Sequence, residues 1–69
     1  MTDHIYKKIE LVGSSKNSIE EAINNAIDAA SKTLNNLDWF EVVETRGNIT
    51  DGHAEYFQVT IRVGFRLAA

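Results

Sequence analysis

The sequence of 69 residues contains no cysteine, so no disulfide can stabilise it. Its only two histidines, His4 and His53, stand far apart without a short ligand spacing, which argues against a metal site. A chain of this length hides only about 60% of the surface that its unfolded form exposes, so its core is thin. Small chains without disulfides or metals usually gain stability from a further interface. We therefore expect this protein to associate with copies of itself.

Long apolar runs and a signal-like start are also missing, because the chain begins with a polar stretch and Lys7 and Lys8 interrupt the apolar residues after it. The lack of cysteine is compatible with a reducing compartment. Together these absences favour a soluble cytoplasmic protein. The formal net charge of −3 argues against general nucleic-acid binding, since phosphate contacts need clustered lysine and arginine.

No catalytic constellation can be recognised either. The two histidines fall near a terminus and in an expected turn, and the serines fall in a loop or on a helix, so no nucleophile triad emerges. The short stretch Gly13-Ser14-Ser15 does not match a glycine-rich phosphate loop. These absences favour a binding or interaction protein over an enzyme.

Periodicity predicts a first strand over residues 4–12, a loop over 13–17 and then a helix over 19–35. The helix begins with a capping box, in which the Ser18 hydroxyl accepts from the backbone of Glu21 and the Glu21 side chain reaches back. Asparagines at the helix end favour a stop there, because asparagine tolerates the left-handed conformation. One face of the helix is apolar and rich in small residues, which would let it lie close to a sheet. That face comprises Ile19, Ala22, Ile23, Ala26, Ile27, Ala30 and Leu34.

A second strand is expected over 39–49, a turn over 50–53 and a third strand over 55–67. The Asp51-Gly52 pair is a strong hairpin signal, and Gly47 indicates a bulge or a close backbone approach. The third strand alternates most clearly, and its apolar members are Phe57, Val59, Ile61, Val63, Phe65 and Leu67. The simplest arrangement is a single α+β domain with an antiparallel sheet in the order 1-3-2 and the helix on its apolar face.

Two side chains could hold a flat ligand. Trp39, the only tryptophan, is either an anchor in a core or interface or a stacking platform for an aromatic ring. Gln58, on the polar face of the third strand, is either solvated or a bidentate reader of an edge like that of uracil.

Three arginines, Arg46, Arg62 and Arg66, could bind a phosphate through their planar forks. The plainer interpretation is solvation or an ion pair, with Glu41 and Glu44 as candidate partners. The hairpin register stays open, because a bulge at the glycine of the second strand would move every side chain to the other face.

Several short matches in the right order resemble the dodecin family of small flavin-binding proteins. They lie at residues 6–15, the Ser18 helix start, 37–42, 46–47 and 63–67, and they span nearly the whole chain. The resemblance implies a three-stranded antiparallel sheet curled around one helix. It also implies a hollow homododecamer, which would remedy the thin core.

By this resemblance, flavins bind in pairs between subunits, with Trp39 stacked outside the two rings and Gln58 bonding the isoalloxazine edge. Bacterial members of the family prefer FMN, although riboflavin also fits. Arg46 is then the candidate for the phosphate, and Arg66 lines a subunit contact or a second ligand site. Coenzyme A is a possible second ligand, to which no residues are assigned.

The function that the resemblance implies is storage of flavin and suppression of its photochemistry, without turnover. The competing hypothesis is a flavin-free oligomeric interaction module, in which Trp39 is only an interface anchor and Gln58 is bystander surface.

Overall fold

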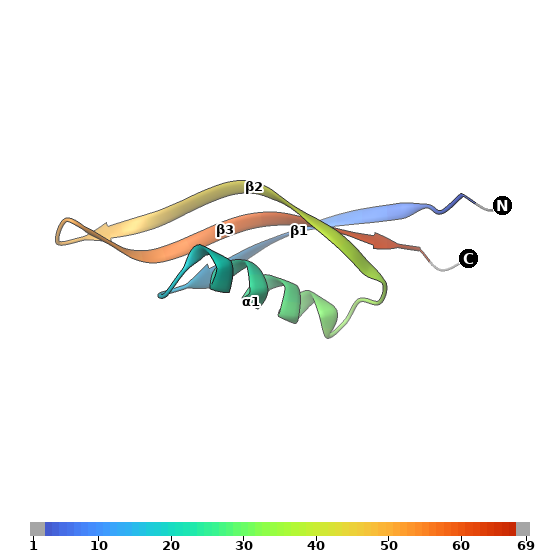
Figure 1. The fold of residues 1–69 in the computed structure, drawn as a ribbon, viewed down its shortest axis with the longest axis horizontal. Coiled ribbons are helices and arrows are strands. Elements are labelled where there is room, and N and C mark those ends of the chain that lie inside the picture. The colour runs from blue at the N-terminus through green and yellow to red at the C-terminus, as the bar shows by residue number, and fades with distance from the viewer. Residues whose placement is uncertain (1–2, 68–69) are drawn as a thin grey trace.

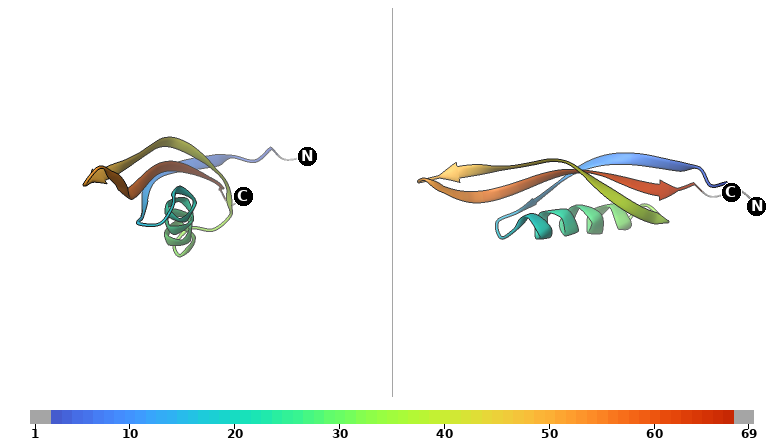
Figure 2. Two further views of the ribbon diagram at one scale, coloured as in Figure 1. Left: turned by 60° about the vertical axis from the view of Figure 1, so that its left-hand side comes forward. Right: turned by 45° about the horizontal axis from the view of Figure 1, so that its top comes forward.

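The computed structural model describes residues 3–67 of the chain. Its elements, in order, are β1 (Tyr6–Ser15), α1 (Ile19–Ser31), β2 (Leu37–Thr50) and β3 (His53–Arg66). The three strands form one antiparallel sheet in the order β1-β3-β2, and α1 lies along one face of it (Figure 1). The sheet curves over the helix when the molecule is seen closer to end-on (Figure 2). The expected fold class and strand order are confirmed.

At the start of α1, only one of the two hydrogen bonds of the expected capping box forms. The Ser18 Oγ accepts a hydrogen bond from the backbone N–H of Glu21 over 3.0 Å. The Glu21 carboxylate does not reach back to Ser18, because it accepts from the side-chain amide of Asn17 at 3.1 Å. The Ser18 N–H donates instead to the Ser15 Oγ over 3.3 Å. The predicted capping box is therefore half right, and Ser15 supplies the missing acceptor.

The helix is shorter than the expected 19–35, because it ends at Ser31. The next backbone N–H groups, of Lys32 and Thr33, donate to carbonyls three residues back and tighten the last turn. Asn36 then takes the left-handed conformation, with φ of 62°, and the chain enters β2. The asparagine signal thus marks the reversal of the chain rather than the last helical residue.

The first strand begins later and runs further than expected, over Tyr6–Ser15 instead of 4–12. The predicted loop at 13–17 is wrong in its first half, because Gly13, Ser14 and Ser15 continue the ladder with β3. A Cβ built on the buried Gly13 would meet the backbone carbonyl of Ala22 in α1. The glycine therefore serves close packing of the strand against the helix, which the turn-like sequence concealed.

The core lies between the apolar face of β3 and the small residues of α1. Val59 and Ile61 are fully buried and Val63 nearly so, and they pack in one cluster with Ala22 and Ala26. Half-buried Ile9 and Leu11 of β1 border this cluster. The alternation of the third strand and the small apolar stripe of the helix are both confirmed.

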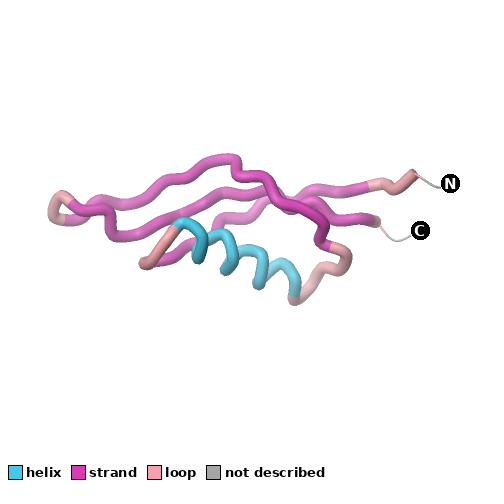
Figure 3. Tube along the Cα trace, viewed as in Figure 1, coloured by secondary structure: helices cyan, strands magenta, loops and turns pink. Residues whose placement is uncertain are grey.

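The β2–β3 hairpin extends beyond the end of the helix as a two-stranded arm (Figures 1 and 3). Its turn is made by Asp51 and Gly52, whose φ angles of 52° and 79° are both positive, as a two-residue hairpin turn of type I′ requires. The turn prediction is confirmed.

No helix among the described residues is long and apolar enough to span a membrane.

The chain is much more extended than a compact domain. Its principal extents are 56 × 20 × 13 Å and its radius of gyration is 14.5 Å, whereas a compact domain of this length has about 11 Å. Its accessible surface is 5088 Å², against about 4,300 Å² for a compact monomer of the same mass. The surplus includes large apolar side chains such as Phe40 and Val42, which are about half exposed. A chain of this shape leaves apolar surface for a partner to cover.

Candidate functional site

The side of the sheet turned away from α1, here called the helix-free face, carries Trp39. A β-bulge places it there. Leu37 pairs with Phe65 and Trp39 pairs with Gly64, so two steps along β2 oppose one step along β3, with Asp38 as the extra residue. Without this bulge, Leu37 and Trp39 would share a face. With it, Leu37 packs against the core and the indole lies on the opposite side.

The indole of Trp39 lies on the backbone of Gly64. A Cβ built on Gly64 would collide with three consecutive ring carbons at nearly equal distances, so one face of the ring covers the glycine. The ring of Tyr6 meets the indole edge to face, with centroids 5.2 Å apart. The tryptophan nevertheless stays 38% exposed. Gly64 thus supports one face of the ring and Tyr6 packs beside it, while part of the ring faces solvent.

The N–H of the indole is satisfied within the chain. Trp39 Nε1 donates to Glu41 Oε2 over 2.9 Å, and Lys8 Nζ contacts the same oxygen at 3.1 Å. Because Lys8 lies on β1 and Glu41 on β2, this network crosses the central strand. Sequence reasoning weighed Glu41 only as a partner for an arginine. The two-residue spacing from Trp39 along a strand, which puts both side chains on one face, was the signal that could have found it.

These contacts change the acidity of the glutamate. The hydrogen bond from Trp39 and then that from Lys8 hold the pKa of Glu41 below its ordinary value, with smaller help from the charges of Lys8 and Arg62. Glu41 is therefore ionised at neutral pH, and a carboxylate accepts a stronger hydrogen bond than a neutral group does.

A second bulge brings Arg46 beside Gln58. Val42 pairs with Ile61 and Glu44 pairs with Thr60, so Val43 is the extra residue and the side chains after it change face. Arg46 is then the direct cross-strand neighbour of Gln58, with Ser14 on the other side. Gln58 is half-buried and Arg46 is exposed. The expectation of a bulge or a close backbone approach at Gly47 is confirmed as a close approach, because a Cβ there would meet the backbone of Tyr56. A third register shift follows directly, between Asn48 and Ile49.

Trp39 and Gln58 are on the same face but not at the same place. Trp39 stands opposite Gly64, six positions from Gln58 along β3, which corresponds to about 20 Å. Arg66, opposite Tyr6, belongs to the tryptophan end, and Arg46 belongs to the glutamine end. The four predicted site residues therefore form two separate pairs in one chain.

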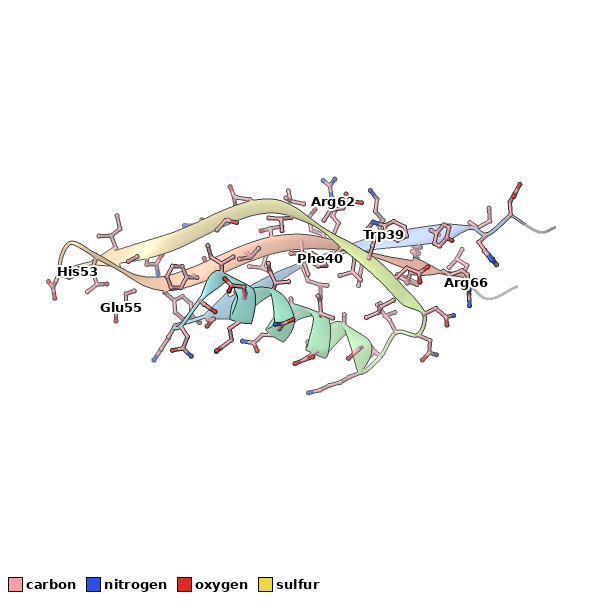
Figure 4. All side chains as sticks on the ribbon, viewed as in Figure 1. Trp39, Phe40, His53, Glu55, Arg62 and Arg66 are labelled. Atoms are coloured by element: carbon pink, nitrogen blue, oxygen red, sulfur yellow. The ribbon has the colours of Figure 1, made fainter. Side chains whose placement is uncertain are left out.

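A hollow that borders Trp39 lies on the other side of the sheet, next to α1, and is too small for a large cofactor. It has a volume of about 140 Å³, whereas pockets for drug-sized ligands and cofactors measure about 300–1,000 Å³. Its lining residues are Ile27, Leu37, Asp38, Trp39, Phe40 and Val63. Figure 4 shows Trp39 and Arg62 at the side of the sheet away from the helix. A flat ligand stacked on this indole would need further walls from another molecule.

Comparison with known proteins identifies the family. The family model described as Dodecin matches residues 5–68. The chain belongs to the dodecin family. It is 52% identical over 63 residues to the dodecin of Thermus thermophilus, and the match covers 91% of each chain. Members of the family are small flavin-binding proteins that assemble into oligomers.

Solved dodecin structures share the fold over nearly the whole chain. A protein of Thermus thermophilus superposes with a TM-score of 0.92 at 49% identity, covering 97% of this chain and 98% of its own. The dodecin of Streptomyces davaonensis gives 0.91 at 50% identity, covering 99% and 100%. A calcium dodecin of Mycobacterium tuberculosis gives 0.79 at 22% identity, covering 93% and 91%, a likeness of fold alone.

The charged side chains of this dodecin pair differently from the expectation. Arg62 forms its ion pair with Glu10 of β1, at 3.1 Å, rather than with Glu41 or Glu44. Glu41 faces Arg62 in the ladder, yet Lys8 makes the contact. The expected arginine partners are therefore wrong, because β1, which borders the other side of β3, supplies both opposing charges.

Neither Arg46 nor Arg66 forms an ion pair within residues 3–67. Within residues 3–67, no three histidine, aspartate or glutamate side chains lie close enough together to hold a metal ion. Among the described cations on the helix-free face of this dodecin, Arg46 and Arg66 are thus the two without an ion-pair partner in their own chain.

Proposed function

We propose that this protein binds FMN or riboflavin, stores it and quenches its photoreactivity, with two flavins stacked between tryptophans of neighbouring subunits of a homododecamer. One observation carries the proposal. The indole of Trp39 lies with one face on Gly64 and remains partly exposed on the helix-free face. A supported, partly exposed indole suits stacking of a flat ring, which tolerates different substituents because it uses no hydrogen-bond readout.

The separation of Trp39 from Gln58 supports a site shared between subunits. About 20 Å of strand divides them, so one flavin could contact both only if they came from different chains. Gln58 would bond the isoalloxazine edge through its amide, which both donates and accepts. Arg46, its neighbour in the ladder, would pair with the phosphate of FMN. Arg66 would line a subunit contact or a second ligand site.

Storage fits the chemistry better than turnover. A flavin clamped between an indole and a second flavin has an electron donor at hand for quenching and little room for a substrate. We therefore propose a non-enzymatic flavin buffer of the cytoplasm, for which the absence of cysteine is suitable. Coenzyme A is a possible second ligand in this proposal, with no residues assigned to it.

The test is a titration of riboflavin and FMN with purified, ligand-stripped protein, following flavin fluorescence while light scattering reports the assembled mass. We expect strong quenching at one flavin per chain in a particle of dodecameric mass. Trp39→Ala should lose most of this quenching, because it removes the stacking platform and the donor together.

The matched control is Ile49→Ala, which truncates an exposed apolar side chain on the hairpin arm, far from the indole. It should quench flavin as the wild type does. An intact large particle that leaves flavin fluorescence unchanged would refute the proposal. The protein would then be a flavin-free interaction module with Trp39 as an interface anchor, a function that the exposed apolar side chains also allow.

A further inference from the structure

Three groups of its own chain contact the Trp39 side chain. Gly64 supports one face of the ring, Tyr6 packs at its side, and Glu41 accepts its only hydrogen-bond donor at 2.9 Å. The first two contacts are apolar and allow the ring to slide or tilt. The hydrogen bond is directional and weakens steeply away from linearity, so it selects one orientation among these.

We propose that Glu41 is a positioning residue that holds the Trp39 indole in its stacking orientation before any ligand arrives, with Lys8 holding the carboxylate in turn. This inference rests on the proposed flavin function and deepens it. A partly exposed tryptophan without such a partner would sample several rotamers, and each bound ligand would bear the cost of ordering it. The carboxylate removes that cost in advance.

The network is built so that the carboxylate itself is held in place. Lys8 Nζ contacts both carboxylate oxygens of Glu41, at 3.1 and 3.3 Å, from the far side of β3. The lowered pKa of Glu41 agrees with a group that stays ionised while it accepts both bonds. Two strands thus fix one side chain across the central strand.

The same hydrogen bond defines what the indole can recognise. With its N–H donated to Glu41, the ring has no free polar atom to offer a ligand, and a tryptophan has no acceptor. A ligand therefore meets only the ring surface. Discrimination among flavins must then come from residues other than Trp39.

The experiment monitors the single indole N–H, which is unambiguous because the chain has one tryptophan. In ligand-free, assembled protein, hydrogen exchange of that N–H and the near-ultraviolet circular dichroism of the indole are measured for the wild type, Glu41→Ala, Glu41→Gln and Glu10→Ala. Riboflavin affinity is measured in parallel. Light scattering and far-ultraviolet circular dichroism establish that each variant is folded and assembled.

We expect Glu41→Ala to speed exchange and to weaken riboflavin binding, each by about fivefold, the equivalent of one hydrogen bond. Glu41→Gln keeps a carbonyl acceptor at the same length and should restore both readouts to within about twofold of the wild type. Glu10→Ala removes the same charge from the same face, but its carboxylate bonds Arg62 and not the indole, so both readouts should stay unchanged.

Each contrary result overturns the inference in a recognisable way. Unchanged exchange in Glu41→Ala would show that Gly64 and Tyr6 hold the ring without the carboxylate. Faster exchange with unaltered riboflavin affinity would show that the ordering does not serve binding. Glu41→Gln behaving like Glu41→Ala would show that an acceptor of the same length does not suffice to order the ring, against the inference. If the wild type itself fails to bind riboflavin, the proposed function fails, whereas the exchange data still decide whether Glu41 orders the indole.

Discussion

At the residue scale, Gly64 decides whether the indole can lie on the sheet at all. Any side chain there would occupy the space of the Trp39 ring, since even a methyl group collides with three of its carbons. The collision involves a side chain rather than backbone, so the ring can tilt away and the fold can survive.

We therefore predict that Gly64→Ala leaves the protein folded but weakens flavin binding by about fivefold, because stacking on an aromatic side chain depends on ring placement. The measurement is a fluorescence titration with riboflavin. The control is a double-mutant cycle with Trp39→Ala. If Gly64 acts through the indole, the alanine at position 64 should add no further loss once Trp39 is gone. An additional loss would indicate a different role for the glycine.

At the scale of elements, the distance between β1 and α1 is set by small residues on both sides. Gly13 faces the backbone of Ala22 and the Cβ of Ala26, and both alanines are buried. A methyl group at Gly13 would meet a carbonyl oxygen that helical hydrogen bonding holds in place. Relief requires the whole helix to move away from the sheet.

We predict that Gly13→Ala destabilises the fold by about 1–3 kcal/mol, the usual cost of inserting a methyl group into a packed contact. Urea unfolding monitored by circular dichroism measures the effect. Lys16→Ala, an exposed change in the loop after β1, should stay within about 0.5 kcal/mol of the wild type. Equal stability of the two variants would mean that the helix and strand can separate freely.

At the scale of the whole molecule, the single chain exposes more surface than a compact domain of its size. Exposed apolar side chains lie on both outer strands of the sheet, among them Val12 of β1 and Phe40 and Val42 of β2. Membership of an oligomeric family agrees with this surface. Burial between subunits would supply the apolar contact that one helix cannot.

We predict that the melting temperature of the protein rises with protein concentration, because association stabilises only the folded chain. Calorimetry over a range of concentrations spanning about two orders of magnitude, with light scattering at each point, tests this dependence on association. A melting temperature independent of concentration, together with monomeric mass, would contradict the prediction and show that the thin core suffices alone.

The sequence by itself determined the order of elements, the central place of β3, the Asp51-Gly52 turn and the apolar contact between the helix and the sheet. These features depend on local patterns: a period of two, a period near 3.6 and turn residues with positive φ. The sequence also pointed to Trp39 and Gln58, because an isolated aromatic ring and a polar amide on an otherwise regular strand are visible without coordinates.

Only the tertiary structure decided which face each of these side chains occupies. The bulges at Asp38 and Val43 reverse the alternation of β2, and nothing in the strand's own pattern indicates where they fall, because pairing with β3 places them. The Glu41 contact with Trp39 and Lys8, and the pairing of Arg62 with Glu10, likewise depend on register across three strands. Side-chain chemistry is local, whereas register is a property of the assembled sheet.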